Sequence, residues 1–304
     1  MAGNLPPDRQ TTHMLDIMHT MFMVVREPGK RLTNCPTDRL TVKPSGFQQP
    51  SRVLDLGCGT GIWMLEMAQK YPHAEFVGVD LHRMGPPNLE LNVVYTAPWD
   101  YESPWAMGEK SWDLIHLQMA LGSVWRWDIL YERILKHLVP GTGYFEQVEL
   151  DYEPRTADAT PLQGPLANWW ETYVKSQYQA CSRPLDYNPA TPERLAHMGF
   201  RDVEHRQYMI PLNEWPQDDQ TPDYQVKRRA AMWWQVAMTP GEDGNGGHGY
   251  EAVSMMPLCK ISGWNPDHVK RLCREALEQA ADPNLHAYNI LHVITARAPG
   301  PDEP

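Results

Sequence analysis

Basic residues are scarce in this chain. Its 304 residues include 27 Lys and Arg against 38 Asp and Glu, which gives a net charge of −11. A protein that binds bare nucleic acid through a general basic surface needs the opposite balance, so we expect no direct binding of nucleic acid. A local basic patch remains compatible with this composition.

Cysteines are few, and they lack the spacing of a structural metal site or of a disulfide framework. Their number is odd and no CxxC pair occurs among them: Cys35, Cys58, Cys181, Cys259 and Cys273. No metal triad is recognisable either, so we expect no metal site. A reducing intracellular compartment fits this use of cysteine best.

Long apolar runs are also missing. No stretch is long enough to span a bilayer, and the opening Met-Ala-Gly-Asn-Leu-Pro-Pro-Asp lacks the charged and apolar regions of a signal peptide. We therefore expect no membrane span. The hydrophobic content of 42% is nevertheless enough for a sizeable core, and no polar linker or internal repeat divides the chain.

The most informative stretch is residues 52–61, Arg-Val-Leu-Asp-Leu-Gly-Cys-Gly-Thr-Gly. It places three glycines at alternate positions, and the helix-compatible run 62–68 follows them. Such glycines allow positive φ and let a ligand approach the backbone, while the next helix points its free amide groups at that ligand. The stretch predicts a strand, a tight turn and a helix, with a small ligand against the turn. A purely structural turn is the alternative.

Acidic residues near this turn indicate which ligand binds there. Ile62 stands where the dinucleotide fingerprint needs a glycine, and Asp55 would repel a pyrophosphate. A carboxylate suits a ligand that carries an ammonium and a sulfonium, as S-adenosylmethionine does. Asp80 ends the predicted strand 75–80, about 20 residues beyond the turn, where a carboxylate can accept both ribose hydroxyls. We therefore predict S-adenosylmethionine as the cofactor.

Further cofactor contacts are predicted at the next strand end. Asp100 follows a predicted strand at 92–95 and could accept the adenine amino group, while Trp99 or Tyr101 covers the ring. A helix N-cap or a solvent-facing acid is the alternative for Asp100. The full set of predicted cofactor-binding residues is Asp55, Gly57, Cys58, Gly59, Thr60, Gly61, Asp80, Leu81, Trp99, Asp100, Tyr101 and His116.

One histidine is a candidate base. Methyl transfer from a sulfonium depends mostly on positioning the acceptor, and a base is needed only when the acceptor is protonated. His116 lies near the end of the predicted strand 112–117, with a structural role as the alternative. Glu146 and Glu149 alternate with apolar residues on a predicted strand at 143–149, which is consistent with one facing the pocket and the other only pairing with a basic residue.

Strands and helices alternate between residues 51 and 155. Strands are predicted at 52–56, 75–80, 92–95, 112–117 and 143–149, and helices at 61–70 and 126–138. This alternation predicts a parallel sheet with helices on both faces, an α/β Rossmann-like fold whose ligand lies at the carboxyl ends of the strands. We predict residues 51–155 to be the core that binds S-adenosylmethionine.

The flanking segments are expected to cover this core. Residues 1–50 contain a predicted amphipathic helix at 11–25 and a loop, and are a candidate lid. Residues 156–304 are predicted to form helical cap insertions plus C-terminal strands that complete the sheet. Trp169 and Trp233 in this cap would form an exposed patch in a complex-forming regulator, or line an enclosed pocket in a small-molecule enzyme.

Several sequence blocks resemble the fungal LaeA-type methyltransferases. These blocks are Glu102–Glu109, Trp112–Met119, Phe145–Glu149, Glu153–Arg155 and His286–His292. The resemblance runs from the leader helix to the last strand. It implies a class I methyltransferase fold, with a seven-stranded Rossmann-like sheet, and S-adenosylmethionine binding at the glycine turn.

The resemblance also implies a function and partners. It indicates a regulator of fungal secondary metabolism and development, in nucleus and cytoplasm, which associates with a velvet-domain protein or a LaeA-like methyltransferase partner and could methylate protein. A small-molecule O- or N-methyltransferase of natural-product biosynthesis and a catalytically silent S-adenosylmethionine-binding scaffold are the alternatives. The basic run Lys227–Arg229 could be a nuclear signal, although three basic residues on a predicted helix are more often a solvated face.

Overall fold

The computed structural model describes residues 9–26, 31–46, 49–215, 223–240 and 246–303. The remaining residues include parts of the predicted leader segment and part of the glycine-rich stretch 241–249, and these parts lie outside the described residues.

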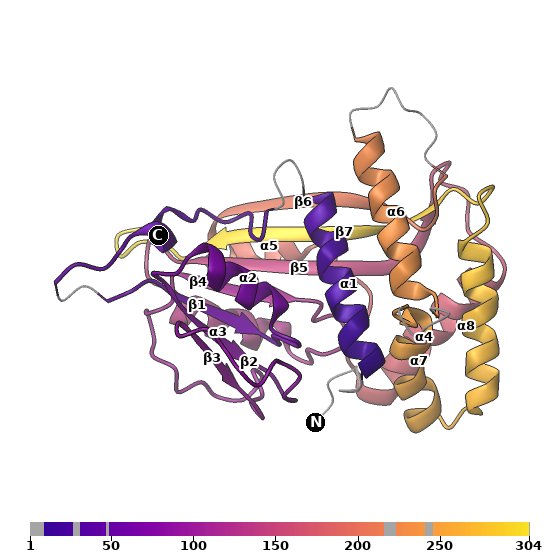
Figure 1. Cartoon of the computed structure of the whole chain (residues 1–304), viewed down its shortest axis with the longest axis horizontal. Helices are drawn as coiled ribbons and strands as arrows, with labels where there is room; N and C mark the ends of the chain where they lie inside the picture. Colours follow the sequence, from indigo (N-terminus) through magenta and orange to yellow (C-terminus); the bar gives the residue numbers. More distant parts are fainter. Residues whose placement is uncertain (1–8, 27–30, 47–48, 216–222, 241–245, 304) are drawn as a thin grey trace.

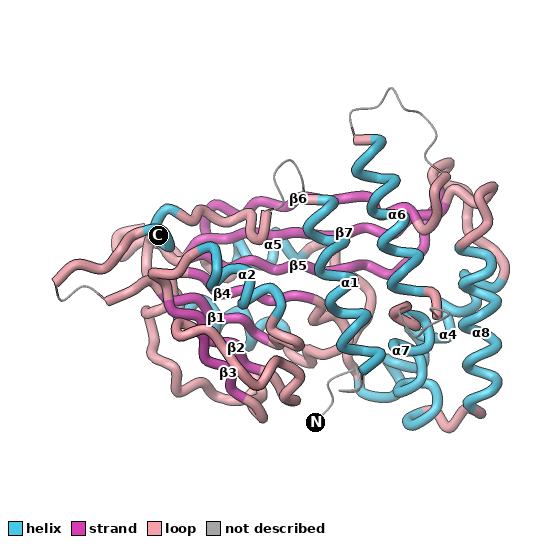
Figure 2. The backbone as a smooth tube through the Cα atoms, viewed as in Figure 1, coloured by secondary structure: helices cyan, strands magenta, loops and turns pink. Residues whose placement is uncertain are grey.

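A seven-stranded sheet forms the centre of the molecule (Figures 1 and 2). Its strand order is β3-β2-β1-β4-β5-β7-β6. The first five strands are parallel, and β7 pairs antiparallel with both β5 and β6. The strands are β1 (Arg52–Leu56), β2 (Glu75–Val79), β3 (Val93–Thr96), β4 (Leu114–Gln118), β5 (Tyr144–Thr156), β6 (Arg201–Pro211) and β7 (Ala287–Arg297). This order confirms the predicted class I methyltransferase fold.

Helices cover both faces of the sheet (Figure 2). They are α1 (Arg9–Val25), α2 (Ile62–Lys70), α3 (Trp127–His137), α4 (Pro165–Cys181), α5 (Thr191–His197), α6 (Tyr224–Met238), α7 (Gly249–Met255) and α8 (Pro266–Ala280), with a 3-10 turn at Asp38–Thr41 and a π-helical turn at Met256–Ile261. Because helices pack on both sides, four of the five residues in β1 and in β4 are buried, and three in each strand are apolar.

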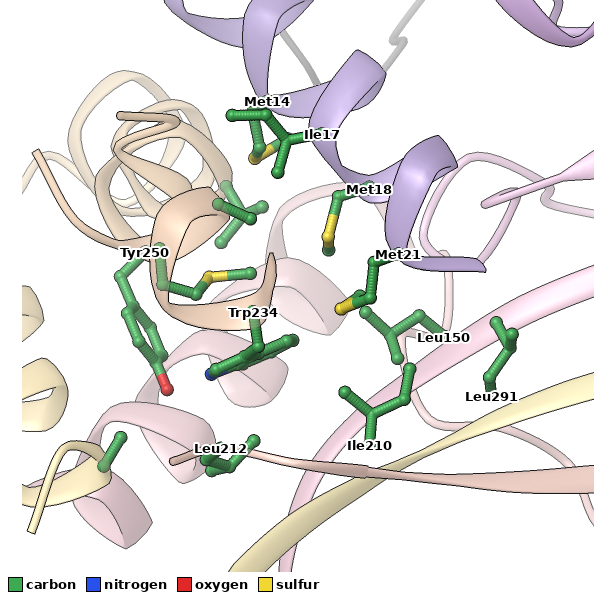
Figure 3. Packing of buried hydrophobic residues seen from close by; sticks show 14 of the residues in the cluster. Met14, Ile17, Met18, Met21, Leu150, Ile210, Leu212, Trp234, Tyr250 and Leu291 are labelled. Atoms are coloured by element: carbon green, nitrogen blue, oxygen red, sulfur yellow. The ribbon is translucent and has the colours of Figure 1, made fainter. Parts of the chain in front are cut away.

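The long strands β5 and β7 separate two apolar clusters. On one face Val148, Leu150 and Leu291 pack against α1, α6 and α7. Figure 3 shows Met14, Ile17, Met18 and Met21 of α1 pointing towards Trp234 of α6 and the strands below them. On the other face Phe145 and Ile294 pack against α3 and α5. Because α1 packs against both the sheet and the helices α6 and α7, it connects the sheet with these helices.

The cap helices α4, α6, α7 and α8 gather at one end of the long strands (Figures 1 and 2). Trp169 of α4 is buried there: its Nε1 donates to Ser254 Oγ at 2.9 Å, and its ring stacks on Tyr173. Trp233 is partly buried against the same cluster. The expected tryptophan patch is therefore wrong for Trp169, because α7 and α8 cover the apolar face of α4. Within the described residues, no helix combines the length and apolar character that crossing a bilayer requires.

Candidate functional site

A cavity lies at the carboxyl ends of β1, β2 and β4. Its walls come from α1, from the glycine turn and from the segments that follow β2, β3, β4 and α4. The lining residues are Leu15, Leu56, Gly57, Gly59, Asp80, Leu81, His82, Met84, Asp100, Tyr101, Glu102, Leu117, Gln118, Met119, Ala120, Ser123 and Arg183. This is the edge of the sheet at which the sequence predicts the ligand.

The glycine turn has the backbone that its sequence predicts. Gly57, Gly59 and Gly61 have φ of +66°, +54° and +78°, a region that side chains disfavour. The amides of Gly57 and Cys58 donate to Val79 O at 2.9 and 3.1 Å, which ties the turn to β2. A Cβ atom on Gly57 would lie 3.3 Å from the Tyr101 ring, so only glycine leaves this part of the cavity open.

Two predicted carboxylates line the cavity. Asp80 accepts hydrogen bonds from the amides of Gly59 and His82, both at 2.9 Å. Asp100 accepts one from the amide of Glu102 at 2.8 Å. A carboxylate has about four lone-pair sites, so Asp80 can still accept hydrogen bonds from two hydroxyls of a ligand. Glycine backbone, two free carboxylate edges and an aromatic ring together fit the predicted S-adenosylmethionine.

Several predicted cofactor residues lie outside the cavity lining, and Cys58 and Thr60 among them make contacts that hold the turn. Cys58 Sγ fills the space above Gly78, since a Cβ atom on Gly78 would lie only 2.8 Å from it. Thr60 Oγ1 donates to Asp16 Oδ1 of α1 at 2.6 Å. Trp99 packs against other aromatic rings. Asp55, Gly61 and His116 are likewise not among the lining residues.

His116 does not occupy the position that a base needs. Its ring is fully buried and stacks on Trp63, with ring centroids 3.7 Å apart. Its Nδ1 lies 3.0 Å from Asp55 Oδ1, and its Nε2 lies 3.6 Å from Glu146 Oε2. Burial lowers the pKa of His116 to about 3, and burial raises the pKa of the Asp55 carboxyl. The geometry does not support the candidate base role, because residue 116 lies in the middle of β4 and faces α2.

Glu146 and Glu149 lie on opposite faces of β5 and have different partners. Glu146 accepts hydrogen bonds from Arg26 Nη2 and from the amide of Asn34, both at 2.6 Å. Glu149 accepts hydrogen bonds from the backbone of the segment that follows β4, part of which lines the cavity. Glu146 therefore pairs with a basic residue. Glu149 contacts the cavity wall by bonding to the backbone amides of that wall.

The leader helix α1 contacts the glycine turn, and its role as a lid stays a prediction. Leu15 lines the cavity, and its Cδ1 would be 3.5 Å from a Cβ atom on Gly59. Further along α1, His19 Nε2 lies 3.1 Å from Glu66 Oε2 of α2. These contacts and the bond from Thr60 to Asp16 fix the helix above the turn.

Other lining residues escaped the sequence prediction. Gln118 ends β4 and Met119 directly follows it, so the rule that ligands lie at strand ends identifies both residues when the strand end is known. Arg183 follows α4, and its Nη2 donates to Glu102 Oε2 at 3.1 Å. No local pattern marks Arg183, because it reaches the cavity only through the packing of α4.

Comparison with known proteins agrees with this geometry. Residues 31–211 match the family model of a methyltransferase domain. Over 97% of its length, the chain is 43% identical to the secondary metabolism regulator laeA of Aspergillus flavus and covers 73% of that protein. The chain belongs to the LaeA family of methyltransferases. This confirms the resemblance seen in the sequence blocks.

Two further LaeA relatives are named differently, one as a methyltransferase and one as a regulator. The chain is 39% identical to the protein-methionine methyltransferase laeA of Emericella nidulans, over 97% of this chain and 72% of that protein. It is 36% identical to the secondary metabolism regulator LAE1 of Cochliobolus heterostrophus, over 97% of this chain and 89% of that protein.

A solved structure shares the fold. It is phosphoethanolamine N-methyltransferase 2 of Haemonchus contortus, determined with phosphomonomethylethanolamine and S-adenosylhomocysteine. The TM-score is 0.52 at 16% identity, over 98% of this chain and 61% of that one. At this identity the likeness shows the class I methyltransferase fold alone.

Proposed function

We propose that this LaeA-family chain is an S-adenosylmethionine-dependent methyltransferase that acts as a regulator of fungal secondary metabolism and development in a protein complex. The observation that carries this proposal is the cavity at the strand ends, where the glycine turn and Asp80 meet in a chain of this family. Its relatives named as secondary metabolism regulators support the regulatory role.

The residues of the cavity would hold the cofactor as follows. The backbone of Gly57 and Gly59 would pass close to the amino-acid part, and Asp80 would accept hydrogen bonds from the ribose hydroxyls. Asp100 and Tyr101 would receive the adenine. When bound, S-adenosylmethionine supplies an electrophilic methyl group on a sulfonium. The chain's own task is to orient the cofactor and acceptor and to exclude water.

The acceptor that suits this site best is a protein nucleophile without a proton to lose. A thioether needs no base, and the histidine predicted as a base lies outside the cavity, with a lowered pKa. One relative is named a protein-methionine methyltransferase, which supports methionine as the acceptor class.

The decisive experiment is transfer of a labelled methyl group. The chain is recovered from fungal cells with its associated proteins, incubated with methyl-labelled S-adenosylmethionine, and label is located by mass spectrometry. The Gly59→Arg variant, designed to block the cavity, is the control. Label on protein methionine supports the proposal, label on a metabolite supports the small-molecule enzyme, and binding without label supports the scaffold.

We further propose that the protein acts with a velvet-domain protein or a LaeA-like partner, in the nucleus and the cytoplasm. The basic run on α6 is a charged helix face: Lys227 pairs with Asp223 at 2.8 Å and Arg228 with Glu214 at 2.6 Å. Copurification tests the partner, and a fluorescent fusion tests the location. If replacing Lys227, Arg228 and Arg229 by alanine leaves the fusion in the nucleus, the run is not the signal.

A further inference from the structure

The segment after β4 forms part of the cavity wall and is held by β5 through three consecutive amides. The amide of Met119 donates to Val148 O at 2.9 Å. The amides of Ala120 and Leu121 both donate to Glu149 Oε2, at 2.9 and 3.1 Å. Met119 and Ala120 line the cavity, so one backbone carbonyl and one carboxylate oxygen of β5 together hold the backbone of this wall.

This backbone needs support because its first residue is in an unfavourable conformation. Met119 has φ of +55°, in the left-handed region that non-glycine residues rarely adopt. Such residues persist where their surroundings hold them, and they are frequent at ligand sites. The hydrogen bonds to Glu149 come directly after Met119 and hold the chain in this turn.

Further hydrogen bonds connect this turn to other residues that line the cavity. The amide of Ser123, another lining residue, donates to Ala120 O at 2.9 Å. Gly122 donates to Pro184 O at 2.7 Å and accepts a hydrogen bond from Gln177 Nε2 at 3.0 Å. Arg183, which lines the cavity beside Glu102, is therefore attached to the segment that Glu149 holds.

Glu149 is itself fixed by neutral groups. Its side chain is buried, and Oε1 accepts a hydrogen bond from Gln147 Nε2 at 3.0 Å. Gln147 Oε1 in turn accepts one from the Tyr131 hydroxyl of α3 at 2.9 Å. In the described part of the chain, the donors to Glu149 are all neutral amides, so its charge is stabilised by hydrogen bonds rather than by an ion pair.

We propose that Glu149 is a positioning residue for cofactor binding: its carboxylate holds the Met119–Leu121 backbone in the shape that forms one wall of the cavity. The proposal rests on the proposed function, since it takes S-adenosylmethionine to be the ligand of this cavity. Glu149 does not line the cavity, and it acts through the backbone.

This arrangement makes cofactor affinity depend on pH. Burial raises the pKa of Glu149 to about 7. Tyr101, Tyr131 and Tyr187 face it from the segment after β3, from α3 and from the segment before α5, and burial raises the pKa of each. His292 lies opposite Glu149 in the sheet register, and burial lowers its pKa to about 3. These four neighbours stay neutral between about pH 5.5 and 8. Within this group of side chains, Glu149 is therefore the one that changes its charge in that range.

On the same strand, Asp151 is the matched control. It is buried on the same face of β5 as Glu149, and burial raises its pKa too. Its carboxylate is bonded to Arg155 and to the amide of Glu153 instead of the cavity wall. Replacing Asp151 therefore changes a buried carboxylate of β5 without touching the Met119–Leu121 backbone.

The test measures the Kd of S-adenosylhomocysteine by calorimetry between pH 5.5 and 8.5, on the full chain. For the wild type we expect Kd to rise as pH falls through 7, by up to about tenfold per pH unit. Glu149→Gln keeps the side-chain volume, but it replaces one carboxylate oxygen by an NH2 group that faces other N–H donors. We therefore expect a high Kd that does not depend on pH and is close to the wild-type value at low pH. Asp151→Asn should keep the wild-type profile.

A Glu149→Gln variant that keeps the wild-type Kd and pH profile would overturn the proposal, and so would an Asp151→Asn variant that loses them. If Glu149→Gln does not fold, Glu149→Asp replaces it: the shorter carboxylate stays ionisable but reaches the two amides poorly, so affinity should fall while the pH dependence remains.

Hydrogen exchange tests the role of Glu149 without any ligand, and so independently of the proposed function. At pH 8 and without ligand, the amides of Ala120 and Leu121 should exchange faster in Glu149→Gln than in the wild type, while those of β5 stay protected. If the wild type binds no S-adenosylhomocysteine at any pH, the proposed function fails. Unchanged exchange at these two amides would overturn the role of Glu149 independently.

Discussion

Asp55 and His116 lie opposite each other on β1 and β4, and Asp55 Oδ1 is 3.0 Å from His116 Nδ1. Glu146 lies on the other side of the imidazole and is bonded to Arg26, just beyond the end of α1. All four side chains are buried. A line of buried polar groups therefore connects the strand that carries the glycine turn with the leader helix.

Replacing His116 should affect stability more than chemistry. In His116→Ala, the carboxyls of Asp55 and Glu146 lose a buried partner, and we expect the free energy of unfolding to fall by about 3 kcal/mol. Urea denaturation measures this. His197→Ala, at an exposed position, should change stability by less than about 0.5 kcal/mol. Lost turnover at unchanged stability would instead restore the base role.

Asp80→Ala should remove cofactor binding while the fold is kept. Loss of hydrogen bonds to a charged acceptor costs about 1.5–3 kcal/mol each, so we expect Kd for S-adenosylhomocysteine to rise at least about 100-fold. Calorimetry gives the affinity and thermal unfolding checks the fold. Asp158→Ala, at an exposed carboxylate that is not among the lining residues, should bind like the wild type. Unchanged affinity in Asp80→Ala would contradict the assignment of the site.

Gly59→Arg should block the cavity. The position has φ of +54°, and a side chain there would start beside Leu15 at the cavity wall. We expect no detectable binding of S-adenosylhomocysteine in calorimetry. Gly46→Arg is the control, because Gly46 also has positive φ, at +60°, but faces open space. Equal loss of binding in both variants would mean that backbone strain, and not obstruction, is responsible.

The contact between α1 and the glycine turn should contribute to cofactor affinity. Asp16→Ala removes the hydrogen bond from Thr60 Oγ1. A single hydrogen bond is worth about 0.5–1.5 kcal/mol, so we expect Kd to rise roughly threefold to tenfold. Thr20→Ala, which removes only a bond within α1, should leave Kd unchanged. An unchanged Kd in Asp16→Ala would show that α1 does not act as a lid through this contact.

His292 should make the fold sensitive to acid. Its Nδ1 lies 2.9 Å from His205 Nε2, and burial lowers its pKa to about 3. The folded state thus binds fewer protons than the unfolded state, whose histidines titrate near 6.5, so stability is full above that pH and is lost as pH falls towards 3. At pH 5 we expect roughly 2 kcal/mol to be lost through this residue.

Urea midpoints at pH 7.5 and pH 5 measure this loss. His292→Gln should show a smaller difference between the two pH values than the wild type, and His197→Ala should show the same difference as the wild type. If His292→Gln is as acid-sensitive as the wild type, the proton that destabilises the fold binds elsewhere.

The sequence predicts the glycine turn well because its requirements are local. The predicted strand 52–56 and the predicted helix 61–70 agree with β1 and α2 to within one residue, and the alternate glycines have positive φ. The strand predicted at 112–117 is observed at Leu114–Gln118. That small shift is decisive, since it moves His116 from the strand end into the sheet and brings Gln118 and Met119 to the cavity.

Long-range contacts could not be predicted from the sequence. Arg26 and Glu146 are 120 residues apart, and Arg183 and Glu102 are 81 residues apart. Their pairing depends on how α1 and α4 pack, which no local pattern specifies. The aromatic spacing around Trp169 likewise predicts an apolar helix face but not that α7 and α8 cover it.

The place of β7 determines when the sheet can be completed during synthesis. β7 is the last strand in the chain, yet it lies between β5 and β6, and among the described strands β6 pairs with it alone. A ribosome delivers β5 and β6 long before their shared partner. Until then the nascent chain carries β5 with an unpaired edge and β6 with none of its partners, the kind of exposed strand that chaperones recognise.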